Sequence, residues 1–498
     1  MTSDTAELAI ADNAGELADA FAPASAPAAN NDADRRALRW PRVLTALDPR
    51  ALDPARATAV RDCWRALWSS RLLVWVAGVG TLVTYGFGPV RHAFNPPGLT
   101  RGFGWLGDLL AAPAARWDAS WFLVISHYGY RPDLGSFTAS RAAFFPLYPL
   151  GMRAFGWVGV PLVLGGVLIS LAALALALYG IHRLTTLELA RVARVSGRSL
   201  LDVGGRGAGD RRLAQADVAR LAVMVTAFAP MAFFLSAVYS EALYLALSVG
   251  LFYAARRGRW ALVGLLGALA STTRSAGIVL LLPALMLYLY GPREDRPPDF
   301  PRARGLAPRY RPRADLWWLA LVPLGLALYM TYLGLGGGDP LSPFHAQDVW
   351  GRHFAGPFVG AWDGIDAALG GARQLLSGQQ GHLYYPIAGN SAFINSEHNL
   401  LLLAFLAAAI VALVGVLRTL PLAYGAYVIA ALALPLSYPV TAQPLMSLPR
   451  FLVVLFPLSV WFAAWLAAHP RARRPALLGS GLLMALFVAQ FATWHWVA

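Results

Sequence analysis

The chain has 498 residues, of which 57% are hydrophobic and 14% are charged, whereas an ordinary soluble domain has about 25% charged residues. Its mean hydropathy is +0.51. These values exclude a water-soluble enzyme, a disordered protein and a secreted disulfide scaffold, and they indicate several transmembrane helices. The single cysteine, Cys63, allows no internal disulfide and no cysteine-based metal site.

All 41 basic residues are arginines, and the formal net charge is +14. Because these arginines lie in the loops between apolar segments, and not on one soluble face, they indicate the cytoplasmic side of a membrane and do not predict nucleic-acid binding. The absence of lysine, together with abundant alanine, is typical of GC-rich coding and favours a bacterial origin.

The N-terminal region divides by charge. Residues 1–34 are acidic and lack the apolar core of a signal peptide, so we expect them to be disordered. Between Arg35 and Arg71 the charge becomes positive and several tryptophans accompany the arginines, which predicts a basic amphipathic segment on the inner leaflet. We therefore separate a cytoplasmic N-terminal segment, residues 1–60, from a membrane domain over residues 64–498.

About eleven apolar segments follow, separated by arginine-rich or Trp/Gly/Pro-rich connections. They lie near 72–88, 158–181, 221–235, 242–255, 260–272, 277–290, 317–335, 400–417, 420–436, 451–468 and 477–496. The strands of a β-barrel would instead alternate apolar and polar residues. The sequence therefore predicts an all-α polytopic membrane protein with about eleven transmembrane helices.

The apolar stretch 260–290 has two interpretations. As one span, it would place the arginines between 293 and 313 outside and break the positive-inside rule. As two short helices, 260–272 and 277–290, it would turn at the polar residues 271–275. A 13-residue helix is about 20 Å long, shorter than the hydrocarbon core of about 30 Å. We favour the pair, because a polar turn is tolerated beside a water-filled cavity.

The arginines also predict an orientation. With the N-terminus inside, most of them fall on cytoplasmic segments, so the long polar-aromatic stretches 89–148 and 336–399 are expected to face outward and to carry short surface helices. The short segment 437–449 is expected to face outward as well. This orientation describes a multi-pass plasma-membrane protein with a cytoplasmic N-terminus and an outward-facing site.

Charged residues in apolar surroundings mark the candidate site, because a charge at the lipid boundary needs a partner or a chemical role. Asp118 lies between Trp117 and Trp121 in the first outer loop, and the alternative to a functional role is a helix N-cap. Glu241 lies at an outer turn between two spans, where capping is again the alternative.

Two arginines add to this set. Arg274 is the only charge between the two short helices, and the alternative to a functional role is snorkelling toward water. Arg450 begins a span on the outer side, against the charge rule. A guanidinium offers a planar fork of donors, so Arg450 is a candidate for holding a phosphate.

The second outer loop offers polar side chains but no metal motif. These side chains are His345, Gln347, Arg352, His353, His382, Glu397 and His398. The histidines lack zincin spacing and the adjacent Glu397 and His398 diverge, so we predict no metal and no other cofactor. No glycine-rich nucleotide motif is present, which argues against a nucleotide-sugar as the direct substrate.

Five blocks, in this order and spacing, resemble the PIG-V family of GPI mannosyltransferase II-like proteins, which has many bacterial members. The blocks are RWDA…GY (116–130), FFPLYP (144–149), FFLSAVYSE (233–241), TTRSAG (272–277) and LPRF (448–451). The resemblance runs from about residue 64 to residue 498 and leaves the N-terminal segment out.

The resemblance implies a GT-C glycosyltransferase fold, a polyprenyl-phosphate mannose donor and a site on the outer face. It also implies that Asp118 matches the acidic residue that such enzymes carry in their first outer loop. We therefore expect Asp118 to be the general base of an inverting transfer to a hydroxyl of a glycolipid, lipoglycan or protein, which gives an α-mannoside. A retaining route would need a second carboxylate as nucleophile, for which Glu241 is the candidate.

The other expected contacts divide by substrate part. The expected donor-phosphate residues are Arg274, Arg450 and Arg116. The expected substrate-binding residues are Trp117, Trp121, His127, Tyr130, Glu241, Tyr239, His345, Gln347 and Arg352. The competing hypothesis is a lipid or sugar transporter or flippase, which the absence of inverted repeats disfavours. The acceptor, the exact donor sugar and the oligomeric state stay open.

Overall fold

The computed structural model describes residues 53–88, 94–130, 140–196, 208–300, 307–336, 338–384 and 391–498. By its internal contacts the chain divides into Met1–Ala57 and Thr58–Ala498. The predicted disordered segment 1–34 and the first part of the predicted basic segment lie outside the described residues.

In the described residues all the secondary-structure elements are helices, as the apolar composition predicts. The longer helices are α4 (Pro54–Tyr85), α9 (Leu162–Ser196), α10 (Ala208–Ala227), α11 (Glu241–Arg256), α12 (Trp260–Ser271), α13 (Leu281–Tyr290), α14 (Leu321–Leu335), α16 (Pro357–Ser377), α17 (Ala392–Thr419), α18 (Leu422–Leu436), α20 (Phe456–Ala468) and α21 (Pro470–Ala492). The shorter elements are α5 (Gly104–Ala111), α6 (Ala119–Tyr128), α8 (Leu147–Trp157), α15 (Ser342–His345), α19 (Leu448–Leu452) and the 3-10 helices η3 (Ala232–Leu235), η4 (Ser275–Leu280), η5 (Ala314–Ala320) and η6 (Ala346–Trp350).

Five helices of the described part are long and apolar enough to cross a membrane. They are Pro54–Tyr85, Leu162–Leu189, Ala314–Leu335, Ala392–Thr419 and Pro470–Ala492. Shorter apolar helices accompany them, and large apolar side chains such as Leu72 of α4 and Leu482 of α21 stay exposed, which suits contact with lipid. All of the predicted apolar segments contain helix, as expected for a multi-pass membrane protein.

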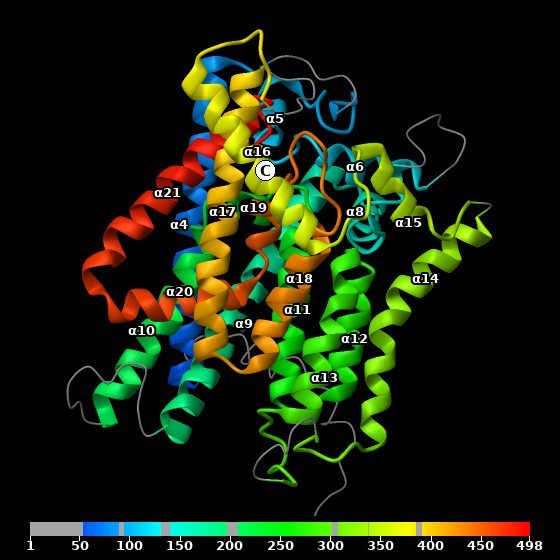
Figure 1. Ribbon diagram of the computed structural model, residues 1–498. Coiled ribbons are helices and arrows are strands. Elements are labelled where there is room, and N and C mark those ends of the chain that lie inside the picture. Colours follow the sequence, from blue (N-terminus) through cyan, green and yellow to red (C-terminus); the bar gives the residue numbers. More distant parts are fainter. Residues whose placement is uncertain are drawn as a thin grey trace, which may run out of the picture. The chain divides into compact units, whose positions relative to one another are not determined.

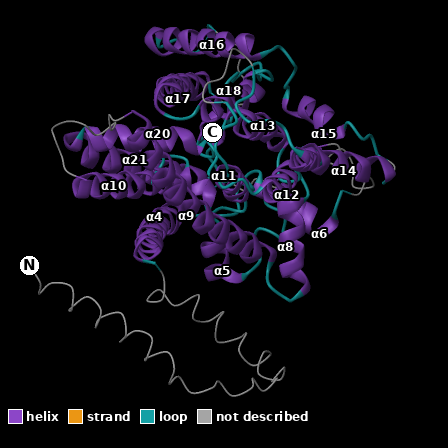
Figure 2. Cartoon of the chain, turned by 90° about the horizontal axis from the view of Figure 1, so that it is seen from below, coloured by secondary structure: helices purple, strands orange, loops and turns teal. Residues whose placement is uncertain are grey.

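Figure 1 distinguishes two ends of Thr58–Ala498. We call the end with α5, α6 and α15 the upper end, and the end with residues 291–300 the lower end. Viewed from below in Figure 2, α11 lies among α9, α12, α13 and α18. Most residues of α11 are buried, so its first residue, Glu241, is held among helices at the upper end.

The two-helix interpretation of the stretch 260–290 is confirmed. Helix α12 ends at Ser271, and η4 and α13 follow after a turn. Gly277 lies directly against the backbone of Ala270 and Ser271, where a Cβ atom would clash. The start of α12 and the end of α13 both lie toward the lower end in Figure 1. The polar turn between the two helices is therefore directed toward the upper end.

The predicted span 221–235 is not one helix. Helix α10 ends at Ala227, and the chain passes Pro230 before η3 begins. Proline lacks an N–H group and disfavours helix at the preceding residue, so carbonyl groups lose their helical partners here. The Arg71 guanidinium binds two of these carbonyls, with Nη1 at 2.7 Å from the oxygen of Ala232 and Nη2 at 2.9 Å from that of Ala227.

Arg71 also corrects the predicted basic segment. It closes the stretch 35–71 that was expected on the inner leaflet, but from Pro54 onward this stretch is continuous with the first span as α4. Arg71 is 1% exposed and donates to the Ser236 hydroxyl at 2.8 Å. Its charge therefore holds α4 against the break after α10 and does not face lipid headgroups.

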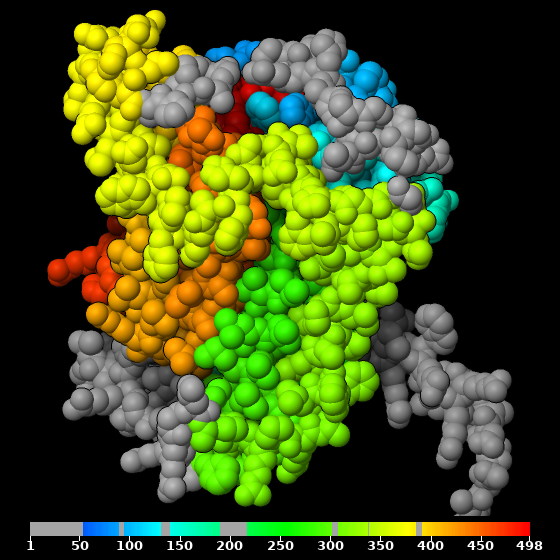
Figure 3. Space-filling model, turned by 45° about the vertical axis from the view of Figure 1, so that its right-hand side comes forward, coloured from blue at the N-terminus to red at the C-terminus, as the bar shows by residue number. Residues whose placement is uncertain are grey.

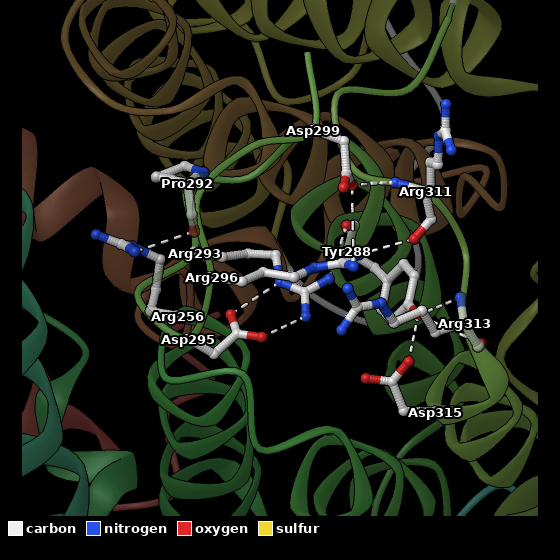
Figure 4. Close-up of polar contacts among 10 residues, drawn as sticks. All are labelled: Arg256, Tyr288, Pro292, Arg293, Asp295, Arg296, Asp299, Arg311, Arg313 and Asp315. Atoms are coloured by element: carbon white, nitrogen blue, oxygen red, sulfur yellow. Dashed lines mark hydrogen bonds and ion pairs between the residues drawn. The ribbon is translucent and has the colours of Figure 1, made fainter. Parts of the chain in front are cut away.

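The described residues of the connection after α13, 291–300 and 307–313, form a set of polar contacts. Arg293 donates to both carboxylate oxygens of Asp295, at 2.9 and 2.5 Å, and Arg296 donates to the carbonyl of Arg311 at 2.7 Å (Figure 4). The N–H of Arg311 donates to Asp299 and lowers the pKa of that carboxyl below its usual value. Several charged side chains of this loop therefore bind partners within the loop itself.

Candidate active site

A cavity of about 420 Å³ lies at the upper end. It is lined by residues from the start of α6, the start of α11, the break between α12 and η4, the segment after α14, the end of α18 and the region of α19. In Figure 3 the yellow-green residues that follow α14 lie beside cyan residues of the first outer stretch and orange residues of α18. The cavity is therefore built from segments that are far apart in the chain.

Four charged side chains form one network in this cavity. Arg450 donates from Nη1 to Asp118 Oδ2 at 2.6 Å, and its Nε lies 3.4 Å from Glu241 Oε1. Arg274 Nη1 lies 2.8 Å from the same Glu241 oxygen. The Glu241 side chain is 2% exposed, and the paired charges offset the cost of removing each from water.

This network argues against the capping interpretation of Asp118 and the snorkelling interpretation of Arg274. Asp118 occupies the N-cap position of α6, but its side chain makes no capping hydrogen bond and pairs with Arg450. Arg274 binds Glu241, with its guanidinium 5.2 Å from the ring centre of Phe451. The ion pairs account for these charges, and capping by Asp118 or snorkelling by Arg274 does not.

The backbone beside Asp118 is strained. Trp117 has a φ of 53°, and its ring packs at centroid distances of 5.5–5.7 Å against Phe94, Trp494 and Trp496. A left-handed conformation costs a non-glycine residue about 1–2 kcal/mol. In the described chain the other non-glycine residues with positive φ are Ser447, which lines the cavity, and Trp494. Strain of this kind gathers where the surrounding structure fixes a functional geometry.

The arginines of the cavity have shifted pKa values. Burial alone would lower the pKa of Arg450, but the negative charges of Asp118 and Glu241 outweigh burial and raise it above its usual value. Burial and the neighbouring positive charge of Arg450 lower the pKa of Arg352 to about 10, against a smaller opposing effect of Asp118. Two carboxylates therefore face Arg450, whereas Arg352 lies beside another cation.

The structure brings most of the predicted site residues together. Those that line the cavity are Trp117, Asp118, Tyr239, Glu241, Arg274, Gln347, Arg352 and Arg450. Arg116 does not line it: this side chain is 3% exposed, donates to the carbonyl of Ala492 at 3.1 Å and stacks on Trp494. The carbonyl of Arg116 accepts a hydrogen bond from Tyr239 at 3.0 Å. Arg116 therefore helps to hold the strained backbone at Trp117 without lining the cavity.

Four other predicted residues also lie outside the cavity lining. Trp121 is stacked on Phe144 at 5.6 Å. Tyr130 donates to the carbonyl of Phe144 at 2.5 Å. His127 and His345 are exposed, and His345 pairs with Asp339 at 2.6 Å. Trp121 and Tyr130 thus hold the wall around Phe144, whereas the two histidines face away from the network.

Sequence reasoning missed several aromatic residues of the cavity, including Tyr244, Trp350 and Trp496. Tyr244 follows Glu241 by three residues on α11, a spacing that places both on one helix face and could have identified it. Trp350 and Trp496 carry no comparable local signal, because they reach the cavity from distant segments. In the described residues no group of three or more His, Cys, Asp or Glu side chains is placed to hold a metal ion.

Comparison with protein families gives one finding. The family model described as Mannosyltransferase (PIG-V) matches residues 93–288, a range that holds Asp118, Glu241 and Arg274 and ends before Arg352 and Arg450. Comparison with the curated proteins and with the solved structures gave no match. Four of the five sequence blocks lie in the matched range. Residues 93–288 are therefore similar to the PIG-V family of mannosyltransferases.

Proposed function

We propose that this protein transfers mannose from a polyprenyl-phosphate mannose donor to a hydroxyl of a glycolipid, lipoglycan or protein. The observation that carries the proposal is a carboxylate, Asp118, in a cavity that also holds three arginines. A base and several cations in one place suit a displacement at a sugar carbon with phosphate as the leaving group. The family match supports mannose as the sugar.

In the proposed reaction Asp118 accepts the proton of the acceptor hydroxyl while that oxygen attacks the anomeric carbon of mannose. The bond from this carbon to the phosphate oxygen breaks, and its electron pair leaves on the polyprenyl phosphate. The cavity arginines stabilise the negative charge that develops there. A single displacement inverts the anomeric centre, so a β-linked donor gives an α-mannoside.

The surroundings of Glu241 support the inverting route. A retaining enzyme would use a second carboxylate as a nucleophile. The Oε1 atom of Glu241 is engaged by Arg274 at 2.8 Å and lies 3.4 Å from Arg450. A carboxylate held in this way is suited to fixing the two arginines, and we assign it that role.

The apolar part of the cavity supports a lipid-linked donor. Ala431, Leu434 and Pro435 of α18 line it, together with Val454 and Leu455. A prenyl chain would gain hydrophobic contact with these side chains, while a nucleotide would find no glycine-rich phosphate loop in the sequence.

We propose further that the cavity faces the outside of the plasma membrane and that the N-terminus is cytoplasmic. The arginine-rich connections at the lower end support this orientation. A donor that carries its sugar on a membrane lipid suits an outward site, where nucleotide-sugars are not supplied.

The test uses purified protein in nanodiscs with radiolabelled polyprenyl-phosphate mannose and a membrane-lipid extract as the acceptor source. We expect Asp118→Asn to reduce transfer by about 10²–10⁴-fold, the usual contribution of a general base, and to leave donor binding intact. Asp366→Asn is the matched control, because Asp366 is an exposed aspartate on α16, and it should transfer mannose as the wild type does.

Two results would contradict the proposal. Wild-type turnover by Asp118→Asn would exclude Asp118 as the base. A wild-type protein that transfers no mannose, but flips the donor across proteoliposomes, would favour the transporter alternative.

A further inference from the structure

Three arginines line the cavity in the described part of the chain, and they differ in their partners. Arg450 is paired with Asp118 at 2.6 Å, and Arg274 is paired with Glu241 at 2.8 Å. No carboxylate of the described residues forms an ion pair with Arg352, whose side chain donates to the carbonyl of Met446 at 3.3 Å. The cavity thus holds three positive and two negative charges, and the surplus charge is on Arg352.

Arg352 is held in place by its backbone. It follows a turn that ends at Gly351 in the left-handed conformation, and its N–H donates to the carbonyl of Gln347 at 3.3 Å. An antiparallel bridge joins Arg352 to Val440, and the N–H of Ala355 donates to the carbonyl of Ser437 at 2.9 Å. The guanidinium is therefore presented from a fixed segment and not from a free loop.

From this difference in pairing we infer that Arg352 binds the phosphate of the lipid-linked donor, whereas Arg274 and Arg450 hold the carboxylates. This inference rests on the proposed function and changes the expected phosphate contacts, which were Arg274, Arg450 and Arg116. A phosphate at Arg274 or Arg450 would share the guanidinium with a carboxylate that already binds it, and the two neighbouring negative charges would repel each other. A phosphate at Arg352 displaces only a weak hydrogen bond to a carbonyl.

The charge balance fits a single phosphodiester. The donor carries one negative charge, which equals the surplus positive charge of the five side chains. When Asp118 takes the proton of the acceptor, the net charge of the cavity rises by one, and the released polyprenyl phosphate becomes a monoester with one further negative charge. The pyrophosphate of a nucleotide-sugar would bring more negative charge than Arg352 offsets.

The neighbours of Arg352 fit the junction between phosphate and lipid. Phe344 and Trp350 precede it on the same wall, and Met446, whose carbonyl it contacts, also lines the cavity. The lowered pKa of Arg352, about 10, reflects burial beside another cation, and a bound anion would relieve both effects. A prenyl phosphate would place its charge on the guanidinium and its first isoprene units against these side chains.

The test is a binding assay that does not depend on turnover. Farnesyl phosphate and uncharged farnesol are titrated into nanodisc-reconstituted protein, and affinity is followed by calorimetry. We expect Arg352→Gln to weaken farnesyl phosphate binding by about 10–100-fold, the range for a charge-assisted hydrogen bond, and to leave farnesol binding unchanged. Arg352→Lys should restore part of the affinity. The matched control is Arg373→Gln, since Arg373 is an exposed arginine on α16.

The outcomes separate this inference from the proposed function. Unchanged farnesyl phosphate binding by Arg352→Gln, or an equal loss of farnesol binding, would overturn the role of Arg352 even if mannose is transferred. Loss confined to the phosphate ligand would uphold that role even if the wild type transfers no mannose, in which case the proposed reaction alone would fail.

Discussion

Glu241 is the residue on which the charged network of the cavity depends, because one of its oxygens faces two arginines. It is the first residue of α11, so its position follows from the packing of a buried helix. If Glu241 is neutralised, Arg274 loses its carboxylate partner and Arg450 keeps only Asp118. Glu241 thus fixes the arrangement of Arg274 and Arg450.

We expect Glu241→Gln to destabilise the protein by about 3–5 kcal/mol, since removing one partner of a buried ion pair leaves the other charge unpaired. Thermal melting in detergent measures the change. The double variant Glu241→Gln/Arg274→Gln should lose less than the sum of the two single variants, because the second change removes the stranded charge. Glu397→Gln, at an exposed position, should melt as the wild type does. Additive losses would argue against the pairing.

At this scale the sequence predicts which residues line the cavity better than it predicts their partners. Asp118, Glu241, Arg274 and Arg450 are conspicuous because each is a charge in apolar surroundings. Asp118 and Arg450 are 332 positions apart in the chain, and nothing local shows that Arg450 holds a carboxylate and not a ligand. Arg352 lies in a loop with many polar residues, so its lack of a carboxylate partner is visible only once the cavity is assembled.

The break between α12 and η4 is the element that carries Arg274 to the cavity. Its turn depends on Gly277, which approaches the backbone of Ala270 and Ser271 too closely for a Cβ atom. The turn also accepts a hydrogen bond from outside itself, because the N–H of Leu147 donates to the carbonyl of Thr272 at 3.0 Å. The pair of short helices is therefore tied to the wall that contains Phe144.

We expect Gly277→Ala to lower the melting temperature and to reduce mannose transfer, because overpacking against a backbone typically costs about 1–3 kcal/mol. Gly479→Ala on α21 is the control, since a Cβ atom there meets nothing within 4 Å and alanine favours helix over glycine. Melting curves and transfer assays of both variants check this. A Gly277→Ala protein with unchanged melting and transfer would contradict the close approach.

Elements were predictable where composition alone decides them. The apolar segments form helices, and the charge rule correctly divides 260–290 into two. The end of α10 at Ala227 was not predicted, because the hydropathy of 221–235 is uninterrupted. The break near Pro230 becomes visible only in the structure, where Arg71 donates to carbonyl groups on both sides of this proline. Hydropathy describes the preference of a segment for lipid, but it does not report where backbone hydrogen bonds are exchanged for side-chain ones.

For the whole molecule, the proposed orientation can be tested by labelling, because the natural chain has one cysteine and Cys63 is buried. We expect His382→Cys, at an exposed position in the segment after α16, to react with a membrane-impermeant maleimide in intact cells. Pro297→Cys, exposed in the lower-end loop, should react only after the membrane is permeabilised. The reverse pattern would place the cavity on the cytoplasmic side.

The buried Arg71 also bears on how the protein is made. Its partners at Ala227, Ala232 and Ser236 follow it by 156, 161 and 165 residues, so α4 leaves the ribosome long before they are synthesised. Until then Arg71 lacks the partners that it has in the folded protein, and a buried guanidinium without partners is costly. The contact between α4 and the break after α10 therefore forms only after the segment around Pro230 has been synthesised. A single guanidinium thus makes the placement of the first long helix depend on a segment that is made much later.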